Sequence, residues 1–171
     1  MENKKERIRK EIVKVREVYN KLLYSLTNAD MAKKSKNAGW TNGEILFHIL
    51  LGFIVVILLF PLVKMFARLP KSWSKKFANF LNFSTPVFNF LNALGARVGG
   101  KIFNKELLKK KFDWVIEGLL KKLSDMKEND WEMGMYAPNK WDSLFDEFMT
   151  LEKLFSYPVK HFNFHAKQIQ V

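Results

Sequence analysis

The sequence predicts an all-α fold, a four-helix bundle with one long irregular connection between its second and third helices. Apolar residues recur at spacings of three and four in several separate stretches, which is the pattern of helices that bury one face. We find no strand-like alternation of any length and no internal repeat. The chain has 171 residues, so we expect a single domain over residues 1–171.

The first predicted helix covers about residues 3–28, because seven apolar side chains follow helical spacing with Lys, Arg and Glu between them. These are Ile8, Ile12, Val15, Tyr19, Leu22, Leu23 and Leu26. Residues 28–39 are rich in Lys, Ser, Asn and Ala, and they predict a loop.

The second predicted helix begins at a capping box, in which the Thr41 hydroxyl accepts from a first-turn amide and Glu44 reaches back to the N-cap amide. Residues 45–63 are apolar almost throughout, and their number is about enough to span a bilayer. Two interpretations compete: the central helix of a soluble bundle, or a single membrane-spanning helix. We favour the bundle because the other amphipathic helices need a partner to bury against.

Residues 70–103 form the predicted long connection, in which phenylalanines are interleaved with asparagines. Thr85 and Pro86 fit an N-cap and the first position of a short helix, which Gly95 ends. Long connections are often lids or binding loops, and the Phe-rich segment 77–90 must cover something apolar. Whether it is a lid or only packs the end of the bundle stays open.

The last two predicted helices lie in the C-terminal third of the chain. Asn104 caps a helix that ends near Ser124, and residues 125–140 form a loop. From Trp141 the apolar residues again follow a helix, which Pro158 breaks or kinks. A restarted helix over about 157–170 completes the prediction.

Charge and cysteine content limit the functional classes. The net charge is +12, with 11 basic and 1 acidic residues over 64–111, so a basic interaction module is one alternative. The chain carries no recognisable nucleic-acid-binding motif, and we expect no nucleic acid partner. It has no cysteine and no apolar signal stretch at residues 1–7, so we expect a cytoplasmic protein without stable membrane insertion.

The candidate site consists of the three histidines of the chain. His161 and His165 lie four residues apart, so both imidazoles leave one face of the last helix. His48, on the second helix, could join them in a bundle. Three nitrogen ligands would leave a position open for water or substrate, and they suit zinc or nickel first, with iron, manganese and cobalt also compatible. The alternative is an exposed pair and one buried histidine without a metal.

Other polar residues near these positions have simpler explanations. Glu44 lies one turn before His48 and could act as an outer-shell partner of the metal, although its capping role already explains it. Ser156 and Tyr157 precede Pro158, where capping is the simpler account than ligand contact. No catalytic residue is assigned from the sequence.

The order of these motifs resembles the DinB superfamily of metal-dependent bacterial proteins. It rests on Trp40 to His48 with the pattern Trp-x-x-x-Glu-x-x-x-His, an Asp130-Trp131 loop, and His161 to Ile169 with His-x-x-x-His followed by Gln-Ile. The resemblance implies a cytoplasmic four-helix bundle whose three histidines hold a divalent metal. Some members of that superfamily are thiol S-transferases or isomerases.

We therefore expect a metal-binding protein with a small-molecule substrate, either a thiol or a hydrophobic compound. Metal-dependent thiol transfer is the first reaction to consider and hydrolysis the second, with the metal as Lewis acid in both. A homodimer is an open alternative.

Overall fold

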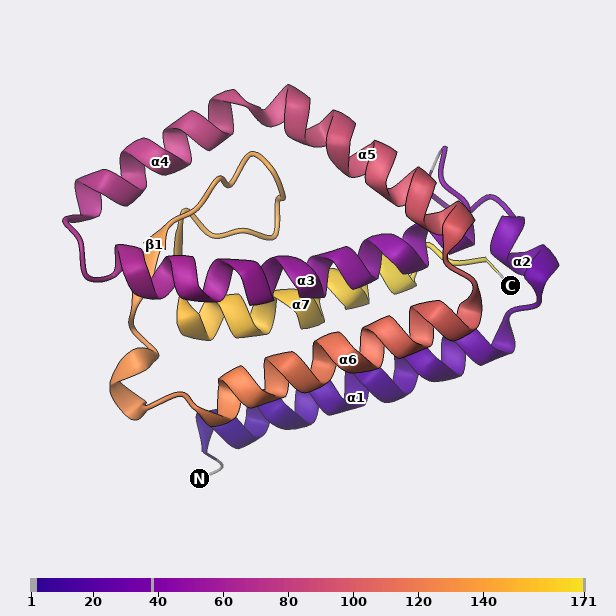
Figure 1. Cartoon of the computed structure of the whole chain (residues 1–171), viewed down its shortest axis with the longest axis horizontal. Helices are drawn as coiled ribbons and strands as arrows, with labels where there is room; N and C mark the ends of the chain where they lie inside the picture. Colours follow the sequence, from indigo (N-terminus) through magenta and orange to yellow (C-terminus); the bar gives the residue numbers. More distant parts are fainter. Residues whose placement is uncertain (1–2, 38, 171) are drawn as a thin grey trace.

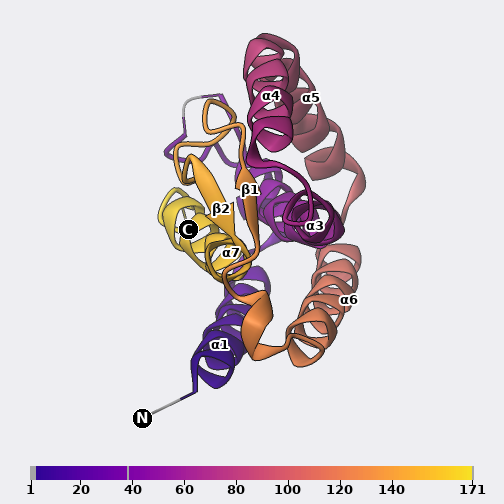
Figure 2. The same cartoon turned by 90° about the vertical axis from the view of Figure 1, so that its left-hand side faces the viewer.

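The computed structural model of the protein describes residues 3–37 and 39–170, and most of them are helical, as the sequence predicts. The four long helices that share the main core are α1 (Lys4–Ser25), α3 (Asn42–Phe66), α6 (Lys105–Ser124) and α7 (Leu151–Ala166). Figures 1 and 2 show α1 beside α6 in a lower layer and α3 beside α7 in the layer above it.

The remaining elements lie around these four helices. A short helix, α2 (Asn28–Ala32), follows α1, and two further helices, α4 (Lys71–Phe83) and α5 (Thr85–Ile102), form an arch above α3 (Figure 1). After α6 come a 3₁₀ turn at Glu128–Asp130 and a small antiparallel hairpin of β1 (Gly134–Tyr136) and β2 (Phe148–Thr150), in which Met135 pairs with Met149.

The helix starts follow the local chemistry of the sequence. Thr41 and Glu44 form the predicted capping box: the Thr41 amide donates to Glu44 Oε2 at 2.8 Å, and the Glu44 amide donates to the Thr41 hydroxyl at 3.3 Å. Asn104 caps α6 in the predicted place, and its side chain accepts from the amide of Leu107. These contacts satisfy amide donors that have no partner within the helix.

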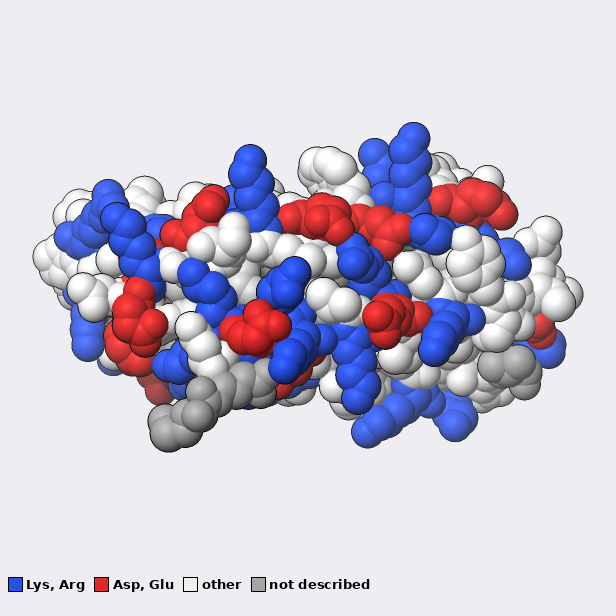
Figure 3. All heavy atoms as spheres, turned by 90° about the horizontal axis from the view of Figure 1, so that it is seen from below, with Lys and Arg blue, Asp and Glu red and all other residues white. Residues whose placement is uncertain are grey.

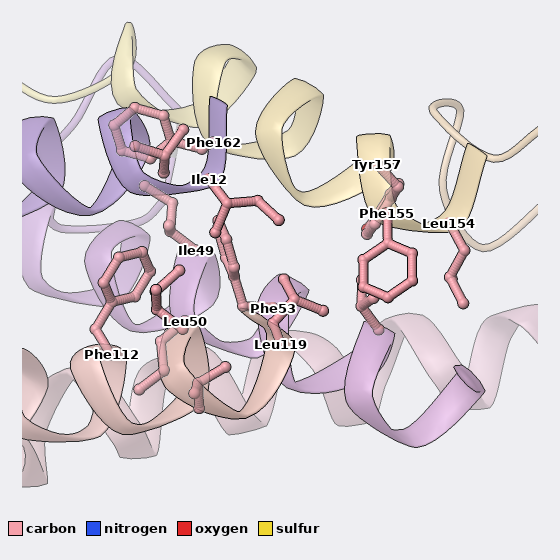
Figure 4. Close-up of a cluster of buried hydrophobic side chains, with 14 of the residues drawn as sticks. Ile12, Ile49, Leu50, Phe53, Phe112, Leu119, Leu154, Phe155, Tyr157 and Phe162 are labelled. Atoms are coloured by element: carbon pink, nitrogen blue, oxygen red, sulfur yellow. The ribbon is translucent and has the colours of Figure 1, made fainter. Parts of the chain in front are cut away.

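The main core is a continuous set of buried apolar side chains from all four long helices (Figure 4). At its centre the rings of Tyr19 and Phe112 stack at 3.8 Å, and Phe53 meets Phe112 edge to face at 4.9 Å. The buried Tyr19 hydroxyl donates to the carbonyl of Leu46 at 3.2 Å. A buried phenol needs such a partner, so this contact also fixes how α1 sits on α3.

The predicted irregular connection over residues 70–103 is wrong, because α4 and α5 fill nearly all of it. The short helix predicted there does begin at Thr85, but it continues past Gly95 to Ile102. Asn and Phe are mediocre helix formers, so local propensity alone leaves this segment undecided. Tertiary packing settles it: Ala96 and Gly99 of α5 are buried against α3, and Gly99 lies against the ring of Phe47. A side chain at Gly99 would overlap that ring, so only glycine allows this close approach of the two helices.

The predicted helix from Trp141 is also wrong over its first part. Residues 141–147 are irregular, and the next three residues form β2, so the expectation of no strand fails here as well. Two local contacts oppose a helix: the amide of Leu144 bonds to Asp142 Oδ1 at 2.8 Å, and Gly134 of β1 lies directly under Phe148. An aspartate that accepts from the backbone two residues on favours a turn.

Pro158 does not interrupt the last helix, because α7 runs from Leu151 to Ala166. The proline removes one intrahelical hydrogen bond, but both halves of α7 remain packed against the core, and this packing keeps the helix continuous. The helix ends four residues before the predicted end at 170. At the other end of the chain, α1 stops at Ser25 and the predicted loop contains α2.

α3 is the one described helix that is long and apolar enough to cross a membrane, judged by length and composition. Within the protein, 39% of its most apolar window is buried, against α5, α6 and α7. Apolar side chains occupy nearly all sides of this helix, which explains why the sequence permits two interpretations of residues 45–63.

We expect Phe53→Ala to lower the free energy of unfolding by about 3–5 kcal/mol, because it leaves a cavity between α3 and α6. Trp114→Ala is the matched control, since Trp114 is 69% exposed on α6. It should change stability by less than about 1 kcal/mol. Urea unfolding followed by circular dichroism measures both, and equal effects of the two substitutions would contradict the described core.

Candidate metal centre

The structure brings the three histidines together. One ring nitrogen from each of His48, His161 and His165 lies within 4.8 Å of the others. The Nε2 atoms of His48 and His161 are 3.2 Å apart, and the ring centroid of His165 is 4.6 Å from that of His48 and 4.5 Å from that of His161. Among the described residues this is the one cluster with metal-ligand geometry.

The cluster forms because α3 and α7 run side by side with little space between them. His161 and His165 project from successive turns of α7 toward α3, where His48 stands. Gly52, one turn after His48, permits this contact: a Cβ atom there would lie 2.4 Å from His161 Nδ1. The glycine therefore provides the space that the imidazole of His161 occupies.

The three histidines differ in the hydrogen bonding of their Nδ1 atoms. His165 Nδ1 lies 2.9 Å from the Gln168 side-chain oxygen, so Gln168 fixes a tautomer that leaves Nε2 free as an acceptor. The Nδ1 atoms of His48 and His161 are buried and have no hydrogen-bond partner among the described residues. A metal ion held by the Nε2 atoms would leave these Nδ1 atoms unpaired, so neither ring has the outer-shell partner that Gln168 gives His165.

Burial holds all three imidazoles in the neutral form. It lowers the pKa of His48 to about 3, with the charge of His165 as a further cause and Asn92 acting in the opposite direction. Burial, followed by the charges of His48 and His165, places the pKa of His161 well below its usual range. The pKa of His165 is also lowered by burial, although Gln168 and Asp142 oppose the shift. Neutral imidazole is the form that binds metals.

The donor set fits a divalent metal ion. Metal–nitrogen bonds of about 2.0–2.1 Å at tetrahedral angles place two ligand nitrogens about 3.3 Å apart. The 3.2 Å between His48 Nε2 and His161 Nε2 agrees with that edge and is also hydrogen-bond distance, whereas the three nitrogens together lie within 4.8 Å of one another. Three neutral nitrogens leave at least one coordination position for another molecule, so the residues could hold a metal in an open site.

A cavity of about 330 Å³ opens beside the histidines and is mostly lined by apolar and aromatic side chains. The arch of α4 and α5 and the loop after β1 enclose it. Phe88 of α5 stacks on Trp141 of that loop at 4.1 Å, and the Trp141 indole donates to the carbonyl of Leu81 at 2.7 Å. These contacts tie the loop to the arch, so the Phe-rich segment does cover an apolar space.

Two polar residues of this cavity, Asp142 and Tyr157, form a hydrogen-bonded pair; the sequence did not single out Asp142 and favoured helix capping for Tyr157. The Tyr157 hydroxyl donates to Asp142 Oδ2 at 2.7 Å, and both side chains line the cavity with the histidines. Burial and the carboxylate of Asp142 raise the pKa of Tyr157, so the phenol stays protonated. Asp142 is the one carboxylate among the described residues that line this cavity.

Of the other residues singled out in the sequence, Glu44 and Ser156 fall outside the cavity. Glu44 forms the capping box and does not line the cavity, so its contacts are structural. The Ser156 hydroxyl bonds to the carbonyl of Glu152 within α7, where it has no role in the site. Tyr157, assigned to capping, points into the cavity instead.

Comparisons of the chain with protein-family models, with curated proteins and with solved structures find no match in any of the three.

We expect Gly52→Ala to lower the free energy of unfolding by about 1–3 kcal/mol, because the added methyl group overlaps the His161 ring. Gly95→Ala on α5 is the matched control, since a Cβ there meets only Leu51 at 3.9 Å. It should be neutral or stabilising by up to about 1 kcal/mol. Chemical unfolding measures both, and a neutral Gly52→Ala would exclude the close contact.

The metal-free protein should lose stability as the pH falls from 7 to 5. Above pH 6.5, the ordinary histidine pKa, the imidazoles are neutral in both the folded and the unfolded state. Below pH 6.5 the histidines of the unfolded chain become protonated while those of the folded chain stay neutral, and this difference favours unfolding. Each histidine can add a slope of up to about 1.4 kcal/mol per pH unit. Urea titrations across this range measure the slope, which His48→Gln should reduce and an exposed Asn163→Gln should not.

Proposed function

We propose that the protein binds one divalent metal ion through His48, His161 and His165 and presents it to a small molecule in the adjacent cavity. The observation that supports this most directly is the convergence of three neutral imidazoles from two helices, with one ring nitrogen of each within 4.8 Å of the others. Clustering three histidines in an apolar interior costs solvation energy at each ring, and a metal ion offsets that cost.

The motif order supports a DinB-like identity for this centre. The Trp-x-x-x-Glu-x-x-x-His pattern carries His48 on α3, and the His-x-x-x-His pattern carries the other two ligands on α7. The packing of α1, α3, α6 and α7 around one core agrees with the four-helix bundle of that superfamily. We propose membership on these grounds, with the α4–α5 arch as an addition to the bundle.

The cavity supports a hydrophobic or thiol substrate. Leu51, Val55 and Leu59 of α3 line one wall, and the stacked Phe88 and Trp141 line another, so an apolar group gains contact area there. A divalent metal would supply Lewis acidity, which favours the thiolate form of a thiol and the hydroxide form of water. Thiol transfer is our first candidate reaction and hydrolysis the second.

Asp142 and Tyr157 provide a route for the proton that such a reaction releases. Asp142 is a carboxylate within the cavity and accepts from the Tyr157 hydroxyl at 2.7 Å. The carboxylate can take the proton of an incoming thiol or water, while Tyr157 keeps it oriented. Asn92, which also lines the cavity, presents an amide that can hydrogen-bond a polar group of the substrate.

Isothermal titration of the metal-free protein with zinc and with nickel tests the metal site. We expect one ion per chain, and His161→Ala should weaken binding by more than the roughly 10–100-fold that loss of an outer-shell partner costs. Gln168→Ala should fall within that smaller range because Gln168 only orients His165. Asn163→Ala, exposed on α7, should bind as the unsubstituted protein does. Equal affinity of the His161→Ala and unsubstituted proteins would refute the site.

Cobalt-loaded protein tests the open position separately. Addition of an alkanethiol should produce a sulfur-to-cobalt charge-transfer absorption, and a longer alkyl chain should lower the required concentration by about fourfold per methylene group, since each buried group contributes about 0.8 kcal/mol. Trp141→Ala should weaken this dependence on chain length by opening the apolar wall. No spectral change with any thiol would exclude thiol binding and leave hydrolysis as the candidate reaction.

A further inference from the structure

The outer side of the α4–α5 arch carries a continuous stripe of exposed apolar side chains. On α4, Trp73, Phe80 and Phe83 share one face, with exposed fractions of 63%, 68% and 87%. Ser74 and Ala78 on the opposite face are buried. A helix with one buried face ordinarily places polar residues on the other, so these aromatic rings are not explained by the core.

The same stripe continues along α5. Val87, Leu91, Leu94 and Val98 recur at helical spacing and are 45–60% exposed. The inward face of α5, with Ala96 and Gly99, is the one that packs on α3. More than half of the large exposed apolar side chains of the described residues belong to these two helices. A patch of this extent marks an interaction surface.

Positive charge accompanies this stripe. Between Glu44 and Glu106 the sequence has eight Lys or Arg residues and no acidic residue. Lys76 lies on the outer face of α4 between Trp73 and Phe80, and Lys101 extends the outer face of α5. Within residues 3–37 and 39–170 no carboxylate pairs with either lysine. The lower face over α1 and α6 differs, because acidic and basic side chains alternate there (Figure 3).

We propose that the outer face of the α4–α5 arch docks on a membrane surface that contains anionic phospholipid. Helices that lie in a membrane interface combine exposed aromatic and aliphatic side chains with lysines that are attracted to anionic lipid. Phe83, the most exposed of the aromatic residues on the arch, stands at its apex where α4 meets α5 (Figure 1), so it would enter the interface first.

Charge complementarity favours this occupant over a second copy of the chain. Face-to-face pairing of two arches would bring Lys76 and Lys101 of each copy together without any acidic residue between them. Like charges at an interface disfavour association, whereas anionic headgroups neutralise them. The docking also leaves the core intact, because it uses side chains that are already exposed, and α3 need not leave its partners.

The proposed docking surface and the cavity lie on opposite sides of the arch. The inner side of the arch covers the space beside the histidines, and its outer side meets the lipid. The docking itself does not depend on a metal. It therefore stands or fails separately from the proposed function.

Co-sedimentation with vesicles tests the proposal on the full-length protein. We expect binding to vesicles of equal parts phosphatidylcholine and phosphatidylserine, and at least about tenfold weaker binding to pure phosphatidylcholine or at high salt. Lys76→Glu with Lys101→Glu should reduce binding by about tenfold or more. Lys110→Glu with Lys111→Glu on α6, which changes the net charge equally, should have a much smaller effect. Equal losses in the two double variants would overturn the proposal.

The apolar stripe is tested by Phe80→Ser with Phe83→Ser, for which Trp114→Ser on α6 is the control of similar exposure. We expect the first variant to lose at least tenfold in vesicle affinity, since each buried ring contributes roughly a factor of ten. The control should retain binding and both should stay folded by circular dichroism. A protein that binds no vesicles, but forms a dimer that the Phe80 and Phe83 substitutions dissociate, would assign this face to a second copy.

Tryptophan quenching locates the membrane contact. Brominated phosphatidylcholine mixed with phosphatidylserine should quench part of the protein fluorescence, and Trp73→Phe should abolish most of that quenching while Trp114→Phe should not. Quenching that persists without Trp73 would mean that another surface meets the lipid, and it would overturn the placement on α4.

Discussion

The close packing of α3 against α7 is the contact on which the rest of this structure depends. At Gly52 the backbone of α3 approaches the His161 ring more closely than any side chain would permit. The same pair of helices contributes a large part of the main core, including Phe53 and Phe155. One interface therefore serves both stability and the histidine cluster, and a change in the spacing of the two helices would alter both.

Burial determines the electrostatic state of the cluster. His161 is 1% exposed, and each imidazole is close to two others, so protonation of any one of them is unfavourable. The site is consequently built from neutral imidazoles in a mostly apolar surrounding. A cation held by such a site would displace no proton at neutral pH, because the protein has already excluded protons from the rings during folding. Packing of the main core supplies the free energy that offsets the cost of burying these polar rings.

The two sides of the α4–α5 arch differ in what they contact. The inner side must fit α3 and the loop after β1, which explains the buried Gly99 and the stack of Phe88 on Trp141. The outer side has no such partner among the described residues, yet a stripe of exposed apolar side chains runs along it beside Lys76 and Lys101. Phe and Leu on that side lie outside the main core, and an exposed apolar patch of this kind is typical of an interaction surface.

Much of the fold and part of the site follow from the sequence alone. Helical spacing and capping residues predict the bounds of α1, α3 and α6 closely. Capping depends on nearby backbone amides and spacing on one apolar face, so both are local effects. The spacing of His161 and His165 likewise placed two imidazoles on one face before any fold was considered. These features do not depend on contacts with residues that are distant in the sequence.

Tertiary structure alone decided the remainder. Residues 70–103 form two helices, and glycines of α5 allow their contact with α3. The segment after Trp141 has a helical pattern of apolar residues, but it forms a turn and a strand that pairs with β1. His48 joined the other histidines, and Asp142 met Tyr157, through contacts between residues far apart in the chain or across a loop. Local propensity differs by less than about 1 kcal/mol per residue between such alternatives, so packing between distant segments decides them.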